Sequence, residues 1–235
     1  MTRSTPSSRS SSDSGPPRAQ VLVMARFPSP GSVKTRLASQ IGAEAAYRLY
    51  DAFVRDLADR LEALELPLTW AFWPPEAPFR TLVPGRRCVP QSGADLGERL
   101  EHGVDECFEA LRVPVIVIGV DSPHLDLIRL REAADALDGA ADLVLGPALD
   151  GGYYLIGLRA PSQRIFRGIE WGSSGVLDAT LAQARAAGMR TRLLEPTFDV
   201  DDIDGLRALR DVLARGEVRL PRTLAALADV VPQAR

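Results

Sequence analysis

The chain has few of the residues that build disulfide frameworks or histidine-based catalytic sites. Its 235 residues include two cysteines and two histidines. Cys88 and Cys107 have no C-x-x-C or other metal-like spacing, so we expect two reduced thiols, as in a cytosolic protein. His102 and His124 have no partner spacing that suggests a catalytic triad. Both histidines are therefore expected to be structural or exposed.

Long apolar runs are also missing. No stretch approaches the roughly 18 residues of a membrane-spanning helix. Residues 1–19 are rich in Ser, Pro and Arg and lack the apolar region of a secretory signal, so we expect a disordered tail there. The formal net charge of -3 offers no bulk attraction to nucleic acid or to an anionic membrane. We expect a cytoplasmic protein with one domain over residues 20–235, no nucleic-acid partner and no membrane span. The oligomeric state is left open.

The chain does have a regular alternation of apolar runs and amphipathic segments. With 46% hydrophobic and 25% charged residues, it can bury a sizeable core. Strands are expected at residues 20–24, 68–73, 87–89, 115–121, 142–145, 153–158 and 190–194. Helices are expected from residue 34, and over 43–64, 95–111, 125–137, 173–187 and 200–214. This order predicts a three-layer α/β/α sandwich around a mostly parallel sheet, with one antiparallel strand near 146–158.

The most informative run is Val115 to Pro123. Its continuous β-branched residues are typical of a parallel strand that is covered on both faces. Asp121 then belongs at the carboxyl end of the strand, where open α/β sheets bind ligands. Its carboxylate suits Mg²⁺ or Mn²⁺, although a helix-capping role is an alternative. Ser122 and Pro123 are interpreted as the N-cap and the first residue of the next helix.

A basic segment follows the first strand. Arg26, Gly31, Lys34, Thr35 and Arg36 combine backbone freedom, cations and a helix N-terminus, an arrangement that suits phosphates. The spacing is neither that of a P-loop nor that of a dinucleotide fingerprint. The alternative is a basic, solvated helix start, in which these cations would oppose the helix dipole.

Two further motifs carry carboxylates. In Asp150-Gly151-Gly152-Tyr153, the glycines allow either a simple tight turn or close approach to a ligand, with Asp150 and Tyr153 facing the crevice. Asp199 and Asp201 alternate along an extended segment and so could converge on a cation. The alternative for the second motif is N-capping of the helix that follows.

The motifs also occur together in one order. They are Ala25-Arg26-x-Pro28-x-Pro30-Gly31-x-Val33-Lys34-Thr35-Arg36-Leu37, Gln91-x-x-x-Asp95-Leu96-Gly97-x-Arg99-Leu100, Gly119-x-Asp121-Ser122-Pro123, Gly146-Pro147-x-x-Asp150-Gly151-Gly152-Tyr153-Tyr154 and Asp199-x-Asp201. Over about residues 20–215 this set resembles the DUF2064 family. Members of that family are assigned as GT-A-type glycosyltransferases, some in arsenosugar biosynthesis, or as radical-SAM/selenodomain-associated transferases.

The resemblance implies a nucleotide-diphospho-sugar transferase fold and a metal-dependent glycosyltransferase with a small-molecule acceptor. Arg26, Lys34 and Arg36 would neutralise the diphosphate, Asp121, Asp199 and Asp201 would hold Mg²⁺ or Mn²⁺, and Asp150 is a candidate general base. The chain has no literal Asp-x-Asp after a mid-chain strand, as many GT-A enzymes do. One alternative is a guanylyl- or cytidylyl-type nucleotidyltransferase that joins an NTP to a phosphorylated acceptor. Another is a non-catalytic module that senses a nucleotide or a nucleotide sugar.

Overall fold

The structure is a computed structural model that describes residues 17–230. A seven-stranded sheet runs through it in the order β3-β2-β1-β4-β6-β5-β7. Strand β6 is antiparallel to both β4 and β5, and the other pairs are parallel. The strands are β1 (Gln20–Arg26), β2 (Leu68–Trp73), β3 (Cys88–Pro90), β4 (Val115–Ile118), β5 (Leu143–Pro147), β6 (Tyr153–Leu158) and β7 (Thr191–Leu193). The predicted mostly parallel sheet with one antiparallel strand is confirmed.

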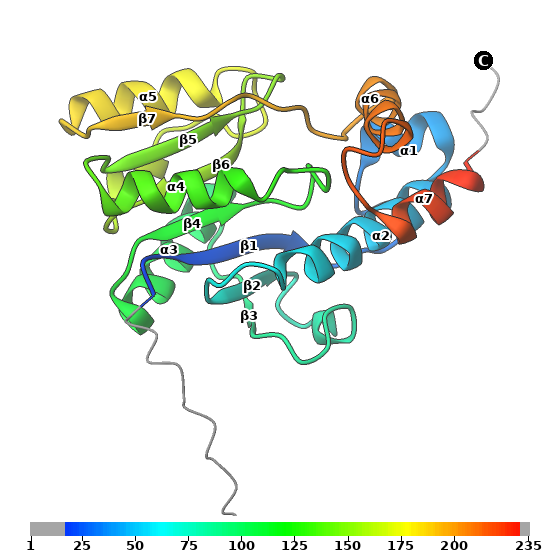
Figure 1. Cartoon of the computed structure of the whole chain (residues 1–235), viewed down its shortest axis with the longest axis horizontal. Coiled ribbons are helices and arrows are strands. Elements are labelled where there is room, and N and C mark those ends of the chain that lie inside the picture. The colour runs from blue at the N-terminus through cyan, green and yellow to red at the C-terminus, as the bar shows by residue number, and fades with distance from the viewer. Residues whose placement is uncertain (1–16, 231–235) are drawn as a thin grey trace, which may run out of the picture.

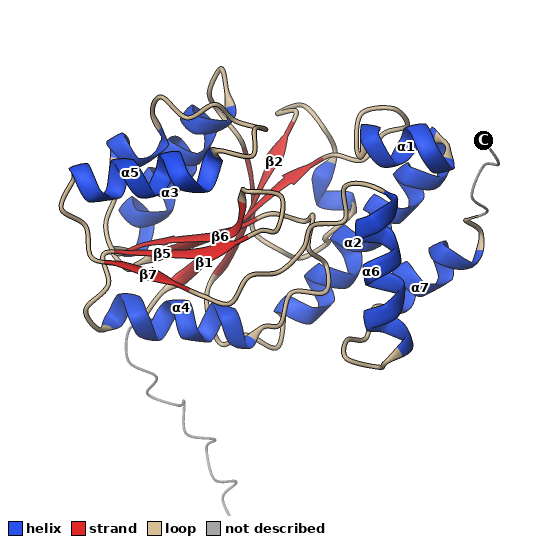
Figure 2. Cartoon of the chain, turned by 90° about the horizontal axis from the view of Figure 1, so that it is seen from above, coloured by secondary structure: helices blue, strands red, loops and turns tan. Residues whose placement is uncertain are grey.

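Helices cover both faces of the sheet, as Figure 2 shows from above. Helices α3 and α5 lie on one face, and α2 and α4 lie on the other. Helices α1, α6 and α7 gather beyond the carboxyl end of β1 (Figure 1). The helices are α1 (Thr35–Ile41), α2 (Ala43–Leu61), η1 (Phe79–Thr81), α3 (Leu96–Leu111), α4 (Ile128–Asp138), η2 (Gln163–Phe166), α5 (Val176–Ala186), α6 (Ile203–Ala214) and α7 (Pro221–Ala228).

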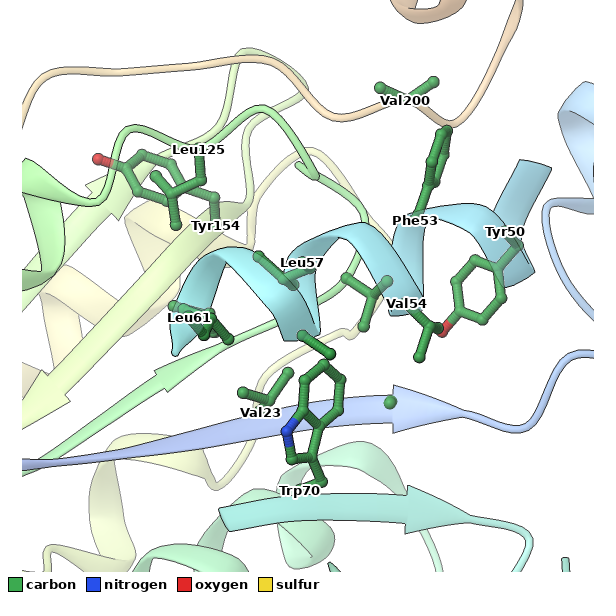
Figure 3. Close-up of a cluster of buried hydrophobic side chains, with 14 of the residues drawn as sticks. Val23, Tyr50, Phe53, Val54, Leu57, Leu61, Trp70, Leu125, Tyr154 and Val200 are labelled. Carbon is green, nitrogen blue, oxygen red and sulfur yellow. The ribbon is translucent and has the colours of Figure 1, made fainter. Parts of the chain in front are cut away.

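Strand β1 shows why the two faces form separate cores. Side chains alternate along a strand, so Val21 and Val23 pack in the α2 layer while Leu22 packs in the α3 layer. All three are fully buried. In the α2 layer, Trp70 of β2 and Val23 of β1 lie between the sheet and the helix, whereas Phe53 of the helix points away from the sheet toward Val200, as Figure 3 shows. The continuous apolar runs of the sequence are therefore typical of strands whose two faces are both covered by helices.

Two acidic residues set helix starts on the site side of the fold. Asp95 caps α3, and its carboxylate accepts a hydrogen bond from Glu98 N at 2.9 Å. Glu98 reaches back to the backbone N–H of Ala94 at 2.8 Å, which completes a box shifted by one residue from the standard pattern. Asp202 caps α6 by accepting from the N–H groups of Asp204 and Gly205. The capping role in the 199–204 segment thus falls on Asp202, which leaves Asp199 and Asp201 available for another task.

Two predicted helix starts are wrong. Ser122-Pro123 does not open a helix, because the Ser122 hydroxyl donates to the Phe198 carbonyl and to Asp199 instead; α4 begins at Ile128. The helix predicted over 173–187 was expected to begin at Ser173 or Ser174, but α5 begins at Val176 and follows Gly175 without a side-chain cap. The Ser173 hydroxyl instead donates a hydrogen bond to the Glu170 carbonyl at 2.8 Å. Helix α7 was not predicted at all.

The ends of the chain bear on two further expectations. The predicted disordered tail covers residues 1–19, of which 1–16 lie outside the described residues. The described part begins at Pro17, and Ala19 is already fully buried. Within residues 17–230, none of the helices has the length and apolar character needed to cross a membrane.

Candidate active site

A cavity of about 420 Å³ opens at the carboxyl ends of β1 and β4, beside the turn that precedes β6. This is the edge at which open α/β sheets bind ligands. A smaller cavity of about 300 Å³ adjoins it over the basic loop and shares Arg26, Arg36, Tyr50, Asp121 and Asp201 with it. The sheet order places β4 between β1 and β6, so Asp121 lies between the basic loop and the Asp150 turn.

Lys34 is the most constrained residue of the site. Its side chain is only 3% exposed, and its ammonium binds both Asp121 and Asp201, the latter at 2.7 Å. Burial by itself would lower the pKa of Lys34, but the two carboxylates outweigh that effect and raise its pKa above the ordinary value. Lys34 therefore stays charged and holds the loop before α1 against the segment before α6. Its backbone is left-handed, with φ 51°.

The guanidinium groups of Arg26 and Arg36, unlike the buried ammonium of Lys34, are open to the two cavities. Both residues are exposed and line both cavities. Across residues 17–230 neither side chain has a hydrogen-bond or ion-pair partner. The backbone of Arg26 is fixed, because its N–H donates to the buried Tyr50 hydroxyl at 3.0 Å. The site thus offers two uncommitted cations on a rigid strand end and helix start, which suits a phosphate-bearing ligand.

Asp199 is half-buried, like the other two carboxylates that were predicted to bind metal. Its Oδ1 accepts a hydrogen bond from Ser122, which ties the segment before α6 to the loop after β4. Burial raises the pKa of Asp199 to about 6, and the Ser122 hydrogen bond opposes this rise while the carboxylates of Asp121 and Asp201 add to it. All three carboxylates line the larger cavity.

The predicted metal set can be tested on these positions. Carboxylate oxygens are the donors that Mg²⁺ and Mn²⁺ prefer, so the donor chemistry fits. Within the described part of the chain, however, no group of three or more His, Cys, Asp or Glu side chains is arranged to hold a metal ion. Lys34 supplies the positive charge between Asp121 and Asp201. The three carboxylates thus have the donor chemistry that a hard divalent cation requires. In this arrangement Lys34 neutralises two of them, Asp121 and Asp201.

The turn at Asp150 combines both interpretations of its motif. Asp150 Oδ1 accepts from Gly152 N at 2.9 Å, so the carboxylate helps to form the turn. Asp150 and Gly152 also line the cavity, whereas Gly151 does not. Gly151 has φ +92°, and a Cβ there would lie 2.1 Å from the Ser174 carbonyl oxygen. The glycine is needed for close approach of two loops rather than for contact with a ligand.

Several residues that line the cavity were not predicted from the sequence to belong to the site. Arg99 lies 3.8 Å from the centre of the Trp73 ring, and Trp171 meets Tyr153 edge-on with ring centres 6.4 Å apart. The Gln91 amide donates to the carbonyls of Ala25 and Ala71. Gln91 and Arg99 belong to the second family motif, so that motif was the available signal. For Trp171 the sequence carries no signal.

The structure brings most of the predicted site residues together. Eight of them line the larger cavity: Arg26, Arg36, Asp121, Asp150, Gly152, Tyr153, Asp199 and Asp201. Lys34 and Thr35 line the smaller one. Gly31 and Gly151 line neither of these two cavities. The burial of Lys34 against two carboxylates differs from the predicted direct contact with a diphosphate.

Comparisons with known proteins bear on the family and the fold of the chain. A family model of uncharacterized proteins conserved in bacteria, DUF2064, matches residues 65–173. A crystal structure from Desulfovibrio desulfuricans G20, described as a candidate nucleotide-diphospho-sugar transferase, is 32% identical. It superposes with a TM-score of 0.84 over 91% of this chain and 95% of that chain. Among curated proteins, none matches the sequence.

More distant structures share the fold. A 4-diphosphocytidyl-2C-methyl-D-erythritol synthase is 15% identical, with a TM-score of 0.56 over 85% of this chain and all of that chain. A cytidylyltransferase from Leptospira borgpetersenii is 12% identical, with a TM-score of 0.54 over 90% of this chain and 93% of that chain. The ordered motifs, the sheet topology and the 32% identical relative lead to one conclusion: this chain belongs to the DUF2064 family and has the nucleotide-diphospho-sugar transferase fold.

Proposed function

We propose that this protein is a glycosyltransferase that takes a nucleotide-diphospho-sugar donor and a small-molecule acceptor. The observation that carries the proposal is the division of charge within one cavity. Arg26 and Arg36, whose guanidinium groups have no partner among the described residues, lie on the side of the cavity next to β1, and Asp121, Asp199 and Asp201 present carboxylates to the same cavity. A diphosphate together with a divalent cation is complementary to both sets of charges.

The roles of the basic residues follow from their surroundings. Arg26 and Arg36 would bind the diphosphate oxygens and stabilise the charge that develops when the nucleoside diphosphate leaves. Lys34 is fully committed to Asp121 and Asp201, so we assign it to positioning these carboxylates and the start of α1. This role replaces direct neutralisation of phosphate in the arrangement that the structure describes.

The predicted metal has a defined place in this proposal. Asp121, Asp199 and Asp201 are the residues that would hold Mg²⁺ or Mn²⁺, which would neutralise charge on the leaving diphosphate. The chain's own part is to hold the three side chains in place. Ser122 orients Asp199, and Lys34 keeps Asp121 and Asp201 together.

Asp150 is the candidate general base. Its Oδ1 is engaged by the Gly152 N–H, and the residue is exposed on the cavity wall. The two nearby tyrosines do not fit the role of base. Burial raises the pKa of both Tyr50 and Tyr153, so their hydroxyls stay protonated near neutral pH. An acceptor hydroxyl placed against Asp150 could pass its proton to that carboxylate.

The first test is thermal stability against nucleotide sugars and nucleoside triphosphates, each with and without Mn²⁺. A ligand that binds only the folded state raises the unfolding temperature by mass action. We expect a metal-dependent rise with at least one nucleotide sugar, and that result would also name the donor class. A rise with a triphosphate and with none of the nucleotide sugars would favour the nucleotidyltransferase instead.

A further inference from the structure

We infer that the acceptor is an uncharged, hydroxylated molecule with an apolar face, of the chemical class of sugars and glycosides. We place it on the β6 side of the cavity, between the Asp150 turn and Trp171. This inference rests on the proposed function, because it assumes that the β1 side holds the donor. It goes further by excluding a phosphorylated acceptor, which the nucleotidyltransferase alternative requires.

The sheet order divides the cavity into two sides. The β1 side carries Arg26 at the end of the strand, Arg36 in α1, and Arg99 of α3 stacked on Trp73 of β2. Asp121 follows β4, the strand that separates β1 from β6. The β6 side is lined by a different set, which consists of Asp150 and Gly152 in the turn, three residues of β6 itself (Tyr153, Tyr154 and Ile156), and Trp171, Gly172, Ser173 and Val176.

The β6 side is firmly held in shape. Leu177 N donates to the Gly151 carbonyl at 2.9 Å, and the Gly151 backbone lies directly against Ser174. Trp171 lies between Tyr153, which it meets at an interplanar angle of 82°, and Gly97 at the start of α3. A Cβ on Gly97 would lie 2.8 Å from the Trp171 ring nitrogen, so the indole fits closely against the helix. This packing preorganises a partly exposed indole on the cavity wall.

The charges on this side select the acceptor. Asp150 is the one charged residue among the described side chains that line it, and the three lining arginines lie on the β1 side. Among the described residues that line this side, a phosphate would meet a carboxylate and no cation, which is costly in a partly desolvated site. A sugar-like molecule could instead pack its C–H face on Trp171 and present hydroxyls to Asp150 and Ser173.

With the donor on the β1 side and the acceptor next to Asp150, the sugar can be transferred in one step. The acceptor hydroxyl oxygen forms a bond to the anomeric carbon of the donor sugar, and its proton passes to Asp150. The bond between that carbon and the diphosphate oxygen breaks, and the nucleoside diphosphate leaves with the electron pair. Arg26 and Arg36 face the side on which this negative charge appears.

The inference can be tested with matched pairs of small molecules. The pairs are methyl glucoside with its 6-phosphate, and glycerol with glycerol 3-phosphate. Saturation-transfer NMR would measure binding to the full-length protein in the presence of saturating inorganic pyrophosphate, which blocks the arginines of the β1 side. Pyrophosphate binding is itself measured first, so that a failure of the donor site is seen separately.

We expect the neutral member of a pair to bind and its phosphate to bind more weakly. Trp171→Ala should weaken binding of the neutral compound about three- to tenfold, and Trp171→Phe should restore most of it. Pyrophosphate affinity should be the same in both variants, which also shows that they fold. The inference is overturned if the phosphates bind as well or better, if no neutral compound binds, or if Trp171→Ala has no effect.

Discussion

The Nζ atom of Lys34 lies 2.7 Å from a carboxylate oxygen of Asp201, a residue 167 positions further along the chain. The same ammonium binds Asp121, so one buried cation connects the basic loop, the loop after β4 and the segment before α6. Asp121 and Asp201 are 49% and 41% exposed, and they face the cavity on their open sides. Lys34 is thus a structural centre of the candidate site.

Replacing Lys34 by Met should destabilise the protein. The change removes the buried charge and leaves two neighbouring carboxylates that repel each other, although water can reach both. We expect a loss of about 2 kcal/mol in the free energy of unfolding, below the usual cost for a fully buried pair. Urea denaturation measures it, with Arg48→Met as the control at an exposed ion pair with Glu44. The control should change by less than about 0.5 kcal/mol. Equal losses would contradict the role given to Lys34.

Arg26 and Arg36 should act on ligand affinity and not on stability. Each lines the cavity with a guanidinium that has no partner within residues 17–230, so Arg26→Met and Arg36→Met should each weaken pyrophosphate binding about tenfold, the usual loss for a charged hydrogen bond. Isothermal titration calorimetry measures the change. Arg207→Met, at an exposed pair with Asp204, serves as the control and should bind pyrophosphate like the wild type. Unchanged affinity in both cavity variants would remove the phosphate site from the β1 side.

How far the sequence predicts this site depends on how local each feature is. The apolar run that begins at residue 115 predicts strand β4, and the structure confirms this strand over Val115–Ile118. Asp121 was predicted at the strand end and lies instead in the loop that follows β4, where it lines the cavity. The partner of Lys34 is not predictable in this way, because no pattern near residue 34 indicates Asp201. Ser122 illustrates the same limit. Its position before a proline is typical of a helix cap, yet contact with Asp199 across the fold takes the hydroxyl away.

The aromatic wall of the cavity shows a second limit. Trp171 follows a short loop without periodicity, and only the packing of that loop against α3 brings its indole to the site. The Asp150 turn lies at the other extreme, since Asp-Gly-Gly before an alternating strand predicts the turn itself. Which of its two glycines meets a neighbour and which faces the cavity is decided by the Ser174 loop.

Gly151→Ala should therefore be costly. The residue has φ +92°, and its new Cβ would lie 2.1 Å from the Ser174 carbonyl oxygen, so the turn and the loop must separate. We expect a loss of at least about 2 kcal/mol in the free energy of unfolding, because backbone strain and the clash act together. Gly188→Ala is the matched control, with φ +67° and nothing within 4 Å of the added carbon. It should lose about 1 kcal/mol from strain alone. If the two variants lose the same amount, the close approach of the loops is not important.

The burial of His124 should make the free energy of unfolding depend on pH. It is buried, stacks on Phe198 with ring centres 3.9 Å apart, and shares a hydrogen bond with Thr197. Burial, with a smaller effect of Arg60, lowers its pKa to about 4. The charged groups around the adjacent cavity are Arg60, Asp126, Arg129, Glu195, Arg215 and Glu217.

Because the folded pKa of His124 is lowered, the unfolded chain binds more protons between about pH 6.5 and pH 4. Above about pH 6.5 the contribution of neutral His124 to the free energy of unfolding is fully present. It is lost as the pH falls from about 6.5 to about 4, by at most about 3 kcal/mol. Urea denaturation across the window measures this loss. His124→Phe keeps an aromatic ring and should flatten that part of the profile, whereas His102→Gln, at an exposed position, should leave it unchanged. A profile of the same slope in His124→Phe would assign the loss to other groups.

The most direct measurement of the central claim is the product released from the donor. The wild-type protein is incubated with Mn²⁺, a neutral glycoside and either a nucleotide sugar or a nucleoside triphosphate, and the products are separated by anion exchange. The account predicts release of a nucleoside diphosphate from the nucleotide sugar, with the sugar joined to the glycoside, and loss of this activity in Arg26→Met. Release of pyrophosphate from the triphosphate, with no turnover of any nucleotide sugar, would contradict it.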